Sequence, residues 1–170
     1  GAPGLGRPSG GPAQVKRTLI TAGANGIGLV MAQAFAGAGH RVWVTDVDSA
    51  AVAAVPAEMR ATLCDASDEG NMCSLFNEIK EEWGGLDVLC ANAGVKGPTA
   101  AIEDIQLDEW RQCLAVNLDG AMLAAKYAAP IMKAQKAGAM IFTSSTAGLH
   151  GFPYRAPYVA AKWGLIGLTK

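Results

Sequence analysis

Five short apolar runs recur along the chain from residue 15 onward, and each is followed by residues that favour turns. Runs of this length, rich in Val, Ile, Leu and Thr, are typical of buried strands. They occupy residues 15–22, 41–46, 61–65, 86–92 and 138–145.

Helical periodicity fills the intervals between these runs. Residues 27–38 form an apolar, Ala-rich segment that Gly39 closes, as expected at a helix C-terminus. A second helix is predicted over residues 48–55. A third is predicted over 67–83, with Ser67 as its N-cap.

A long helix is predicted over residues 107–136, with several larger side chains along one side: Trp110, Leu114, Asn117, Leu118 and Met122. A final helix begins at Pro157, because proline suits the first helical turn. Alternation of strands and helices predicts one α/β domain, a doubly wound parallel sheet of the Rossmann type in the order 3-2-1-4-5-6.

The chain ends at Lys170 inside this last helical pattern. We therefore expect residues 15–170 to form one α/β domain that is truncated at its C-terminus, without the sixth strand. The fifth strand would then be an exposed sheet edge. Residues 1–14, rich in Gly and Pro, are predicted to be a flexible tail.

Composition narrows the function classes. Of the 170 residues, 51% are hydrophobic and 17% charged, and the net charge is −1. No basic run indicates a nucleic-acid partner, and no apolar stretch is long enough to span a membrane. The four cysteines show no CxxC spacing, which favours reduced thiols in the cytoplasm and predicts no metal site.

The first predicted strand leads into the sequence TAGANGIG at residues 21–28. Small residues between a strand and a helix allow a tight turn, and the helix N-terminus then binds a pyrophosphate. About 20 residues later the second strand ends in Asp46, where a dinucleotide fold places the acid that binds a ribose 2′-hydroxyl. A carboxylate there repels a 2′-phosphate, so NAD is favoured over NADP.

Tyr158 and Lys162 are four residues apart on the final predicted helix, so their side chains share one face. A free tyrosine loses its proton only near pH 10 and is a poor acid or base at neutral pH. A neighbouring ammonium stabilises the phenolate. The pair is therefore a candidate acid/base and its electrostatic partner, and a surface contact is the simpler alternative.

In order and spacing, these motifs resemble the short-chain dehydrogenase/reductase family. The resemblance rests on TAGANGIG, on CANAG at residues 90–94, on Ser145 and on YVAAK at residues 158–162, and it extends from Val15 to Lys170. Ala22 stands where the family has its first glycine, and we expect the adjacent Gly23 to serve the same turn. Ala91 stands where the family has the first asparagine of its Asn-Asn-Ala-Gly motif.

The resemblance implies a role for each matching residue. Tyr158 is the catalytic acid/base, Ser145 binds the substrate oxygen, Lys162 also holds the nicotinamide ribose, and Asn117 continues a proton path through a water. Ser144 is the adjacent alternative to Ser145. The implied cofactor-binding residues also include the acid that meets adenine, Asp65; the full set is Gly23, Asn25, Gly26, Ile27, Gly28, Asp46, Asp65, Ala66, Asn92, Ala93, Gly94, Tyr158 and Lys162.

The resemblance implies that residues 15–170 are an NAD-binding catalytic domain that is truncated before the family's substrate loop. The implied function is hydride transfer between NAD and a small secondary alcohol or ketone. Two alternatives remain: an NADPH-linked 3-oxoacyl-thioester reductase of the same family, and an inactive truncated NAD-binding or interaction protein. The resemblance also implies a homodimer or homotetramer for the full-length protein. Near the expected substrate pocket, the segment between Ser145 and Tyr158 places Leu149, His150 and Tyr154.

Overall fold

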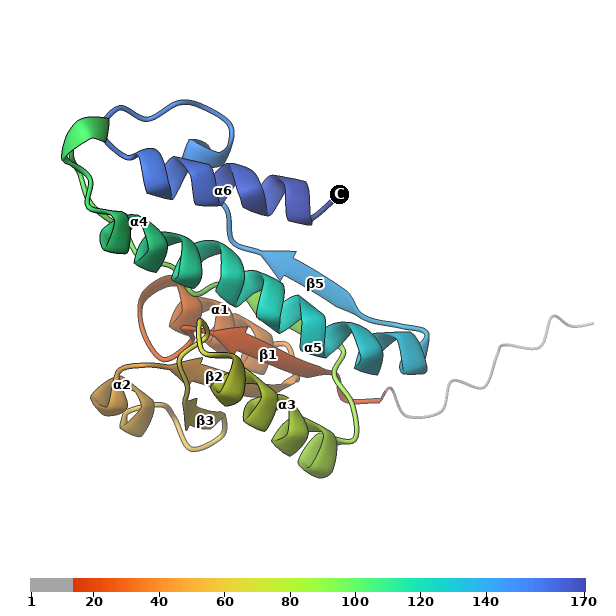
Figure 1. Cartoon of the computed structure of the whole chain (residues 1–170). Coiled ribbons are helices and arrows are strands. Elements are labelled where there is room, and N and C mark those ends of the chain that lie inside the picture. The colour runs from red at the N-terminus through yellow and green to blue at the C-terminus, as the bar shows by residue number, and fades with distance from the viewer. Residues whose placement is uncertain (1–13) are drawn as a thin grey trace, which may run out of the picture.

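The computed structural model describes residues 14–170, so the predicted tail lies outside the described residues except for Gln14. A single parallel sheet with the strand order β3-β2-β1-β4-β5 forms the centre of the molecule (Figure 1). Its strands are β1 (Arg17–Thr21), β2 (Arg41–Asp46), β3 (Arg60–Leu63), β4 (Val88–Ala91) and β5 (Ala139–Phe142). This order confirms the predicted doubly wound fold for the five strands.

Helices join successive strands, which is what parallel pairing requires. Their bounds are α1 (Gly26–Gly37), α2 (Ser49–Ala53), α3 (Glu69–Trp83), α4 (Leu107–Leu114), α5 (Gly120–Gln135) and α6 (Ala156–Leu168). Two short 3₁₀ turns, η1 (Ile102–Asp104) and η3 (Thr146–Gly148), lie in the connections before α4 and α6. Each predicted helix is therefore present.

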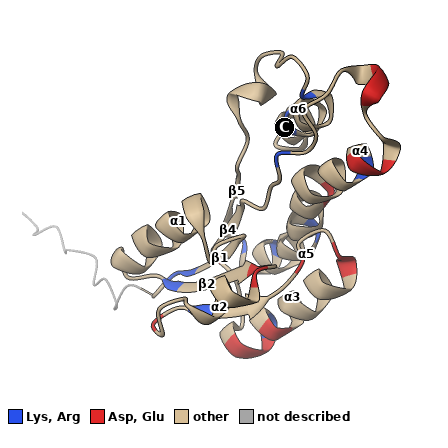
Figure 2. Cartoon of the chain, turned by 90° about the vertical axis from the view of Figure 1, so that its left-hand side faces the viewer, with Lys and Arg blue, Asp and Glu red and all other residues tan. Residues whose placement is uncertain are grey.

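The sheet separates two apolar cores. One lies under α1 and α2 and includes Ile20, Val44 and Ala32. The other lies under α3, α5 and α6 and is larger, with Trp43, Phe76 and other side chains fully buried. Figure 2 shows the sheet between these two layers, and it also shows that α1 carries no charged residue whereas α3 and α4 carry many.

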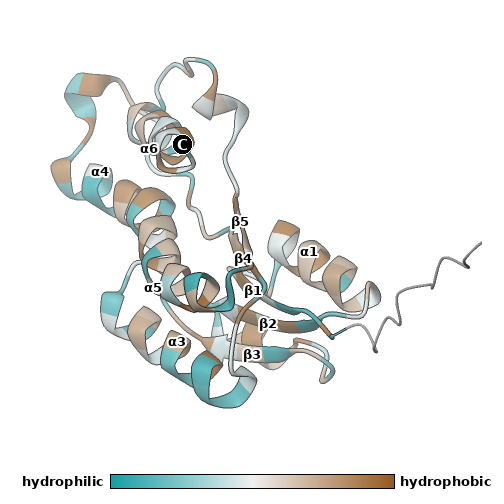
Figure 3. Cartoon of the chain, turned by 90° about the vertical axis from the view of Figure 1, so that its right-hand side faces the viewer, coloured by the Kyte–Doolittle hydropathy of each residue, from teal (hydrophilic) through white to brown (hydrophobic). Residues whose placement is uncertain are grey.

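α3 corrects one prediction about a helix start. Its N-cap is Asp68, whose carboxylate accepts a hydrogen bond from the backbone N–H of Asn71. Ser67, the predicted cap, instead donates its hydroxyl hydrogen to Asp65. A carboxylate caps as well as a hydroxyl and also interacts favourably with the helix dipole, so Asp68 takes the position. The outer face of α3 is hydrophilic (Figure 3).

The predicted long helix contains an irregular turn in its middle. Residues 115–119 form a π-helical turn between α4 and α5. The wider turn inserts one residue into the helical register, so the apolar face rotates beyond it. Met122 is consequently 40% exposed, while Ala121 and Leu123 on either side are buried. The single continuous face predicted from Trp110 to Met122 is wrong for this reason.

β5 is an edge strand within the described residues, as predicted. It pairs with β4 alone, and Ile141 is 44% exposed. Three of the four free cysteines, Cys64, Cys90 and Cys113, are buried, and burial raises the pKa of the Cys64 and Cys90 thiols to about 11. Such thiols stay protonated and unreactive at neutral pH.

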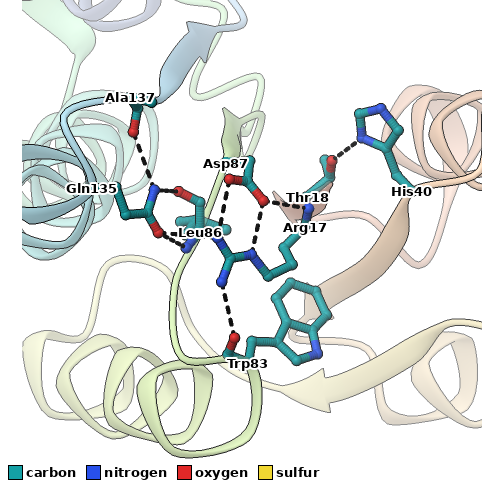
Figure 4. Close-up of polar contacts among 8 residues, drawn as sticks. All are labelled: Arg17, Thr18, His40, Trp83, Leu86, Asp87, Gln135 and Ala137. Atoms are coloured by element: carbon teal, nitrogen blue, oxygen red, sulfur yellow. Dashed lines mark hydrogen bonds and ion pairs between the residues drawn. The ribbon is translucent and has the colours of Figure 1, made fainter. Parts of the chain in front are cut away.

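At the amino ends of the strands, a network of polar side chains joins the two halves of the sheet (Figure 4). Arg17 of β1 donates from Nε to Asp87 and from Nη1 to the carbonyl of Trp83, at 2.8 and 2.9 Å. Gln135 at the end of α5 accepts from the N–H of Leu86 and donates to the carbonyl of the same residue. The guanidinium of Arg17, the carboxylate of Asp87 and the side-chain amide of Gln135 are therefore all bonded within the protein.

Candidate active site

A cleft of about 490 Å³ opens at the opposite, carboxyl ends of β1, β4 and β5. This is the topological switch point of the sheet, where β1 and β4 are neighbours and their helices leave on opposite faces. Its lining residues are Ala22, Asn25, Ile27, Gly28, Asp46, Asn92, Gly94, Val95, Lys96, Asn117, Thr143, Ser144, Ser145, Tyr158 and Lys162. Segments from across the whole sequence therefore meet at one site.

The glycine-rich turn differs from the prediction at its first two positions. Ala22, and not Gly23, has the left-handed conformation, with φ of 49°. Gly23 is required for another reason, since a Cβ there would lie 2.8 Å from the side chain of Val44. The prediction that Gly23 replaces the missing turn glycine is therefore wrong. The turn keeps its shape because Ala22 accepts a strained backbone.

The other two glycines of the turn shape the approach to α1. Gly26 has a φ of 51° and open space around it. A Cβ on Gly28 would collide with the carbonyl oxygen of Ala22 and lie 2.8 Å from Nδ2 of Asn92. Asn25 is the N-cap of α1, and the first turn of α1 contains no acidic residue. These features leave a small-residue cradle at a helix N-terminus, and that fits a pyrophosphate group.

Asp46 lies at the end of β2 and borders the cleft. Its carboxylate accepts hydrogen bonds from the backbone N–H groups of Ala24 and Asp48, at 3.3 and 3.2 Å. These two bonds orient the carboxylate between the glycine-rich turn and the start of α2. The placement fits the predicted contact with ribose hydroxyls.

Asn92 connects the ends of three strands. Its Nδ2 donates to the carbonyl of Ala22 at 3.2 Å, and its Oδ1 accepts from the hydroxyl of Thr143 at 3.0 Å. The backbone N–H groups of Asn92 and Ala93 both donate to the hydroxyl oxygen of Thr21. The short motif after β4 therefore holds the floor of the cleft together through side-chain bonds that the strand ladder does not supply.

Asn117 lies in the π-helical turn and is completely buried. Its Nδ2 donates to the carbonyls of Cys113 and Val95, both at 2.9 Å, and its Oδ1 accepts from the N–H of Val95. Gly94 allows this arrangement, because a Cβ there would lie 2.8 Å from Oδ1 of Asn117. π turns inside α-helices are frequent at functional sites.

The structure distinguishes the two adjacent serines. The hydroxyl of Ser144 donates to the carbonyl of Lys162 in α6, at 3.3 Å. Ser145 caps η3, and its oxygen accepts a hydrogen bond from the N–H of Ala147 at 3.2 Å. An oxygen that already accepts a bond keeps its own hydrogen for another acceptor. Ser145 therefore has a free donor at the cleft, whereas the donor of Ser144 is engaged.

Tyr158 and Lys162 both line the cleft from α6, with the Lys162 ammonium 5.5 Å from the centre of the Tyr158 ring. Lys162 is only 3% exposed, and its Nζ donates to the carbonyl of Thr143 at 2.9 Å. Burial lowers the pKa of this ammonium. One donor is engaged by the protein, so two remain for a ligand.

Not every residue that was predicted to bind the cofactor lines the cleft. Gly23, Gly26, Ala93, Asp65 and Ala66 lie outside its lining. The carboxylate of Asp65 is exposed and accepts two bonds from Ser67. Sequence reasoning also missed lining residues: Val95, Lys96 and Thr143 belong to the cleft. Their position immediately after β4 and β5 is the signal that could have found them.

Two further findings concern residues 14–170 as a whole. None of the helices in this range is both long and apolar enough to cross a membrane. Over the same range, no group of three His, Cys, Asp or Glu side chains is arranged to hold a metal ion.

Sequence comparisons yield many curated relatives. The short chain dehydrogenase/reductase dpchG of Colletotrichum higginsianum is 37% identical over 164 residues, covering 91% of this chain and 61% of that protein. A trans-4-hydroxycyclohexanecarboxylate dehydrogenase of Sinomonas cyclohexanicum is 37% identical over 168 residues, covering 91% and 64%. The 3-oxoacyl-[acyl-carrier-protein] reductase MabA of Mycobacterium avium is 35% identical over 162 residues, covering 95% and 62%. The chain spans about three fifths of the length of these relatives.

Solved structures give the same result for the fold. An NAD⁺-bound xylitol dehydrogenase superposes with a TM-score of 0.87 and 28% identity, covering 91% of this chain and 62% of that one. A metagenomic short-chain oxidoreductase in complex with NADP superposes with a TM-score of 0.86 and 32% identity, covering 90% and 72%. Structures with either cofactor are therefore among its neighbours.

The family model for short chain dehydrogenase matches residues 16–170, nearly the whole described range. That match agrees with the strand order, with the glycine-rich turn before α1, and with the Tyr158–Lys162 pair beside Ser145 in one cleft. The chain therefore belongs to the short-chain dehydrogenase/reductase family of oxidoreductases.

Proposed function

We propose that this chain carries the catalytic and cofactor-binding residues of an NAD-dependent oxidoreductase that interconverts a small secondary alcohol and its ketone. One observation carries the proposal: Ser145, Tyr158, Lys162 and Asn117 meet in a cleft that also contains Asp46 and the first turn of α1. Acid/base residues and a dinucleotide cradle are thus arranged around one space.

In this proposal Tyr158 accepts the hydroxyl proton of the alcohol, and the free O–H of Ser145 donates to the substrate oxygen. Lys162 places a buried positive charge beside the phenol and has two donors for the ribose hydroxyls. When bound, the nicotinamide supplies the hydride acceptor. Asn117 holds the loop at Val95 against the helix and continues the proton path toward solvent. The protein supplies position and charge.

NAD is the proposed cofactor because the Asp46 carboxylate faces the cleft and is oriented by two backbone bonds. A 2′-phosphate placed there would be repelled. The neighbouring structures include complexes with NAD⁺ and with NADP, so the preference rests on Asp46 alone.

The NADPH-linked 3-oxoacyl-thioester reductase remains the second candidate, and the 35% identity to MabA favours it. Asp46 opposes it. The third candidate, an inactive NAD-binding or interaction protein, predicts cofactor binding without turnover. We also propose the cytoplasm as the location and a homodimer or homotetramer as the assembly of the full-length protein, which light scattering would test.

The catalytic proposal is tested by Tyr158→Phe, which removes only the hydroxyl. We expect formation of NADH from a panel of cyclic secondary alcohols to fall at least about 100-fold, which is the scale of acid–base catalysis. Binding of NAD, measured by calorimetry, should change little. Unchanged turnover by the variant would refute the acid/base assignment, and NAD binding by a wild-type chain without turnover would favour the third candidate.

The cofactor proposal is tested by Asp46→Ser. We expect the wild-type chain to bind NAD more tightly than NADP and the variant to lose much of that discrimination, because the variant removes the repulsion of the 2′-phosphate. Tighter binding of NADP by the wild-type chain would contradict the assignment.

A further inference from the structure

Arg155 is a charged residue that the catalytic scheme does not use. It does not line the cleft itself, but it contacts two residues that do, Lys96 and Tyr158. It stands directly before α6, three residues before Tyr158, so the two side chains lie on the same side of the helix start. The guanidinium carbon of Arg155 is 5.1 Å from the centre of the Tyr158 ring. Lys162 approaches the same ring at 5.5 Å, so two cations lie near the phenol.

The bonding of Arg155 is incomplete. One terminal nitrogen, Nη2, donates to the carbonyl of Lys96, which ties the start of α6 to the loop after β4. The Nε atom is buried and has no hydrogen-bond partner. No carboxylate within the described residues lies within 4 Å of this guanidinium, since the ion pairs there involve only other cations: Arg17, Arg60 and Lys126. A partly buried charge without a counter-ion is unfavourable, so the site favours an anion.

The charged residues around Arg155 also favour the binding of an anion. The residues that line the cleft around Tyr158 include Lys96 and Lys162, and the one acid in that lining, Asp46, lies at the end of β2. The positive field reaches Cys113, where burial raises the pKa of the thiol and the charges of Arg155 and Lys162 oppose the rise. The acids of η1, Glu103 and Asp104, are exposed and lie outside the lining.

An apolar groove of about 700 Å³ is lined by Tyr154 and Ala156, the residues on either side of Arg155 in the sequence, and not by Arg155 itself. Residues 100–102 form one wall and residues 151–154 form the other, and Ala156 and Val159 of α6 complete it. The N–H of Ala100 donates to the carbonyl of Tyr154 at 3.0 Å, which joins the two walls. Tyr154 has a φ of 63°, a strained conformation of the kind that is often found at functional sites. No charged side chain lines this groove.

We propose that Arg155 is a specificity residue that binds a carboxylate of the substrate, so the substrate class is a secondary alcohol with an apolar body and one carboxylate. This inference rests on the proposed function for the alcohol group of the substrate, whereas the binding of a carboxylate by Arg155 does not depend on that function. The guanidinium offers planar paired donors that match a carboxylate. The apolar groove beside it fits a hydrocarbon ring, and the carboxylate then neutralises the unpaired charge.

The test compares two probes that share a six-membered ring, cyclohexanecarboxylate and cyclohexanol, by calorimetry on the 170-residue chain with NAD present. We expect the carboxylate to bind more tightly and Arg155→Met to weaken it about 10- to 100-fold, the scale of a charge-assisted hydrogen bond. Binding of cyclohexanol should change less than about 2-fold. Arg155→Lys should restore part of the loss, and Arg111→Met, an exposed arginine of α4, is the matched control.

Three outcomes would overturn the inference. In the first, the folded wild-type chain shows no saturable binding of the carboxylate. In the second, Arg155→Met binds the carboxylate as tightly as the wild-type chain does. In the third, Arg155→Met loses as much affinity for cyclohexanol as for the carboxylate, which would indicate only a structural role for Arg155. The affinity for NAD identifies the source of the anion, because a loss of NAD binding in Arg155→Met would assign the arginine to a cofactor phosphate and also overturn the inference. Carboxylate binding that depends on Arg155, in a chain without alcohol oxidation, would support this inference and refute the proposed function.

Discussion

The two ends of the parallel sheet differ in whether their buried charged side chains have a counter-ion. At the amino ends of the strands, Arg17 pairs with Asp87 at 2.8 Å, and the pair is enclosed by further bonds to protein groups (Figure 4). At the carboxyl ends, Lys162 and Arg155 have no carboxylate within ion-pair distance among the described residues. The amino end therefore neutralises Arg17 within the chain, whereas no carboxylate of the described residues neutralises Lys162 or Arg155 at the carboxyl end.

This difference separates stability from function by a physical criterion. A buried charge that is paired and hydrogen-bonded contributes to the folded state, whereas an unpaired buried charge opposes it and is typical of binding sites. Lys162 is 3% exposed and Arg155 retains an unsatisfied Nε. The structure tolerates both, and this supports the function proposed for the carboxyl end.

The largest expected effect comes from breaking the pair at the amino end. Asp87→Ala leaves the Arg17 guanidinium partly buried without its carboxylate and should lower the free energy of unfolding by about 3 kcal/mol. Urea unfolding measures it. Glu78→Ala is the matched control, because Glu78 pairs with Arg60 at an exposed site and should change stability by less than about 0.5 kcal/mol. Equal effects of the two variants would contradict the comparison.

The same pair should respond to pH. Hydrogen bonding to Arg17 lowers the pKa of Asp87 in the folded chain. A depressed carboxyl pKa contributes stability that is fully present above the unfolded value, near 4, and is lost as the pH falls through the folded value. Urea unfolding at pH 7 and pH 3 should therefore show a smaller difference between wild type and Asp87→Asn at pH 3. A constant difference would show that the bond does not depend on the carboxylate charge.

A smaller effect of opposite sign is expected at the carboxyl end. Lys162→Met removes a buried, unpaired charge, and it should raise the free energy of unfolding by about 1 kcal/mol. Because burial lowers the Lys162 pKa in the folded chain, this gain should be largest at neutral and low pH. NAD binding should weaken in the same variant.

Lys126→Met is the matched control for that variant, since Lys126 is exposed and pairs with Glu69 on the surface. It should leave both stability and NAD binding nearly unchanged. A marked loss of stability in Lys162→Met would show that its bond to the Thr143 carbonyl is structural.

The smallest effect is expected at the glycine-rich turn. Ala22→Gly relieves the left-handed strain at φ of 49°, offset by the entropy that glycine loses on folding, and should stabilise the chain by about 0.5 kcal/mol. Ala24→Gly is the control, because its φ is not positive and the same change should destabilise. Thermal unfolding of both variants measures the difference. A loss of stability in Ala22→Gly as large as in the control would contradict the strain.

Much of the fold followed from local pattern. Apolar runs and helical periodicity located the five strands and the helices, and their alternation implied the parallel order. The pattern failed where one residue changes register or a neighbour competes: the π turn at Asn117 displaced Met122 from the buried face, and Asp68 replaced Ser67 as the cap of α3. The hydrophobic periodicity of the sequence indicates neither the π turn nor the choice of cap, because both depend on which backbone hydrogen bonds the packed helix can make.

The sequence by itself determined the spacing of Tyr158 and Lys162, because a helix places residues four apart on one face. It also placed Asp46 and Ser145 at strand ends. Only the tertiary structure decided which hydroxyl is free, since Ser144 donates to α6 and Ser145 does not. Only the tertiary structure shows that Arg155 lies beside Tyr158 without a counter-ion. The reason is physical: periodicity specifies neighbours along an element, whereas hydrogen-bond partners and unpaired charges depend on segments distant in sequence that folding brings together.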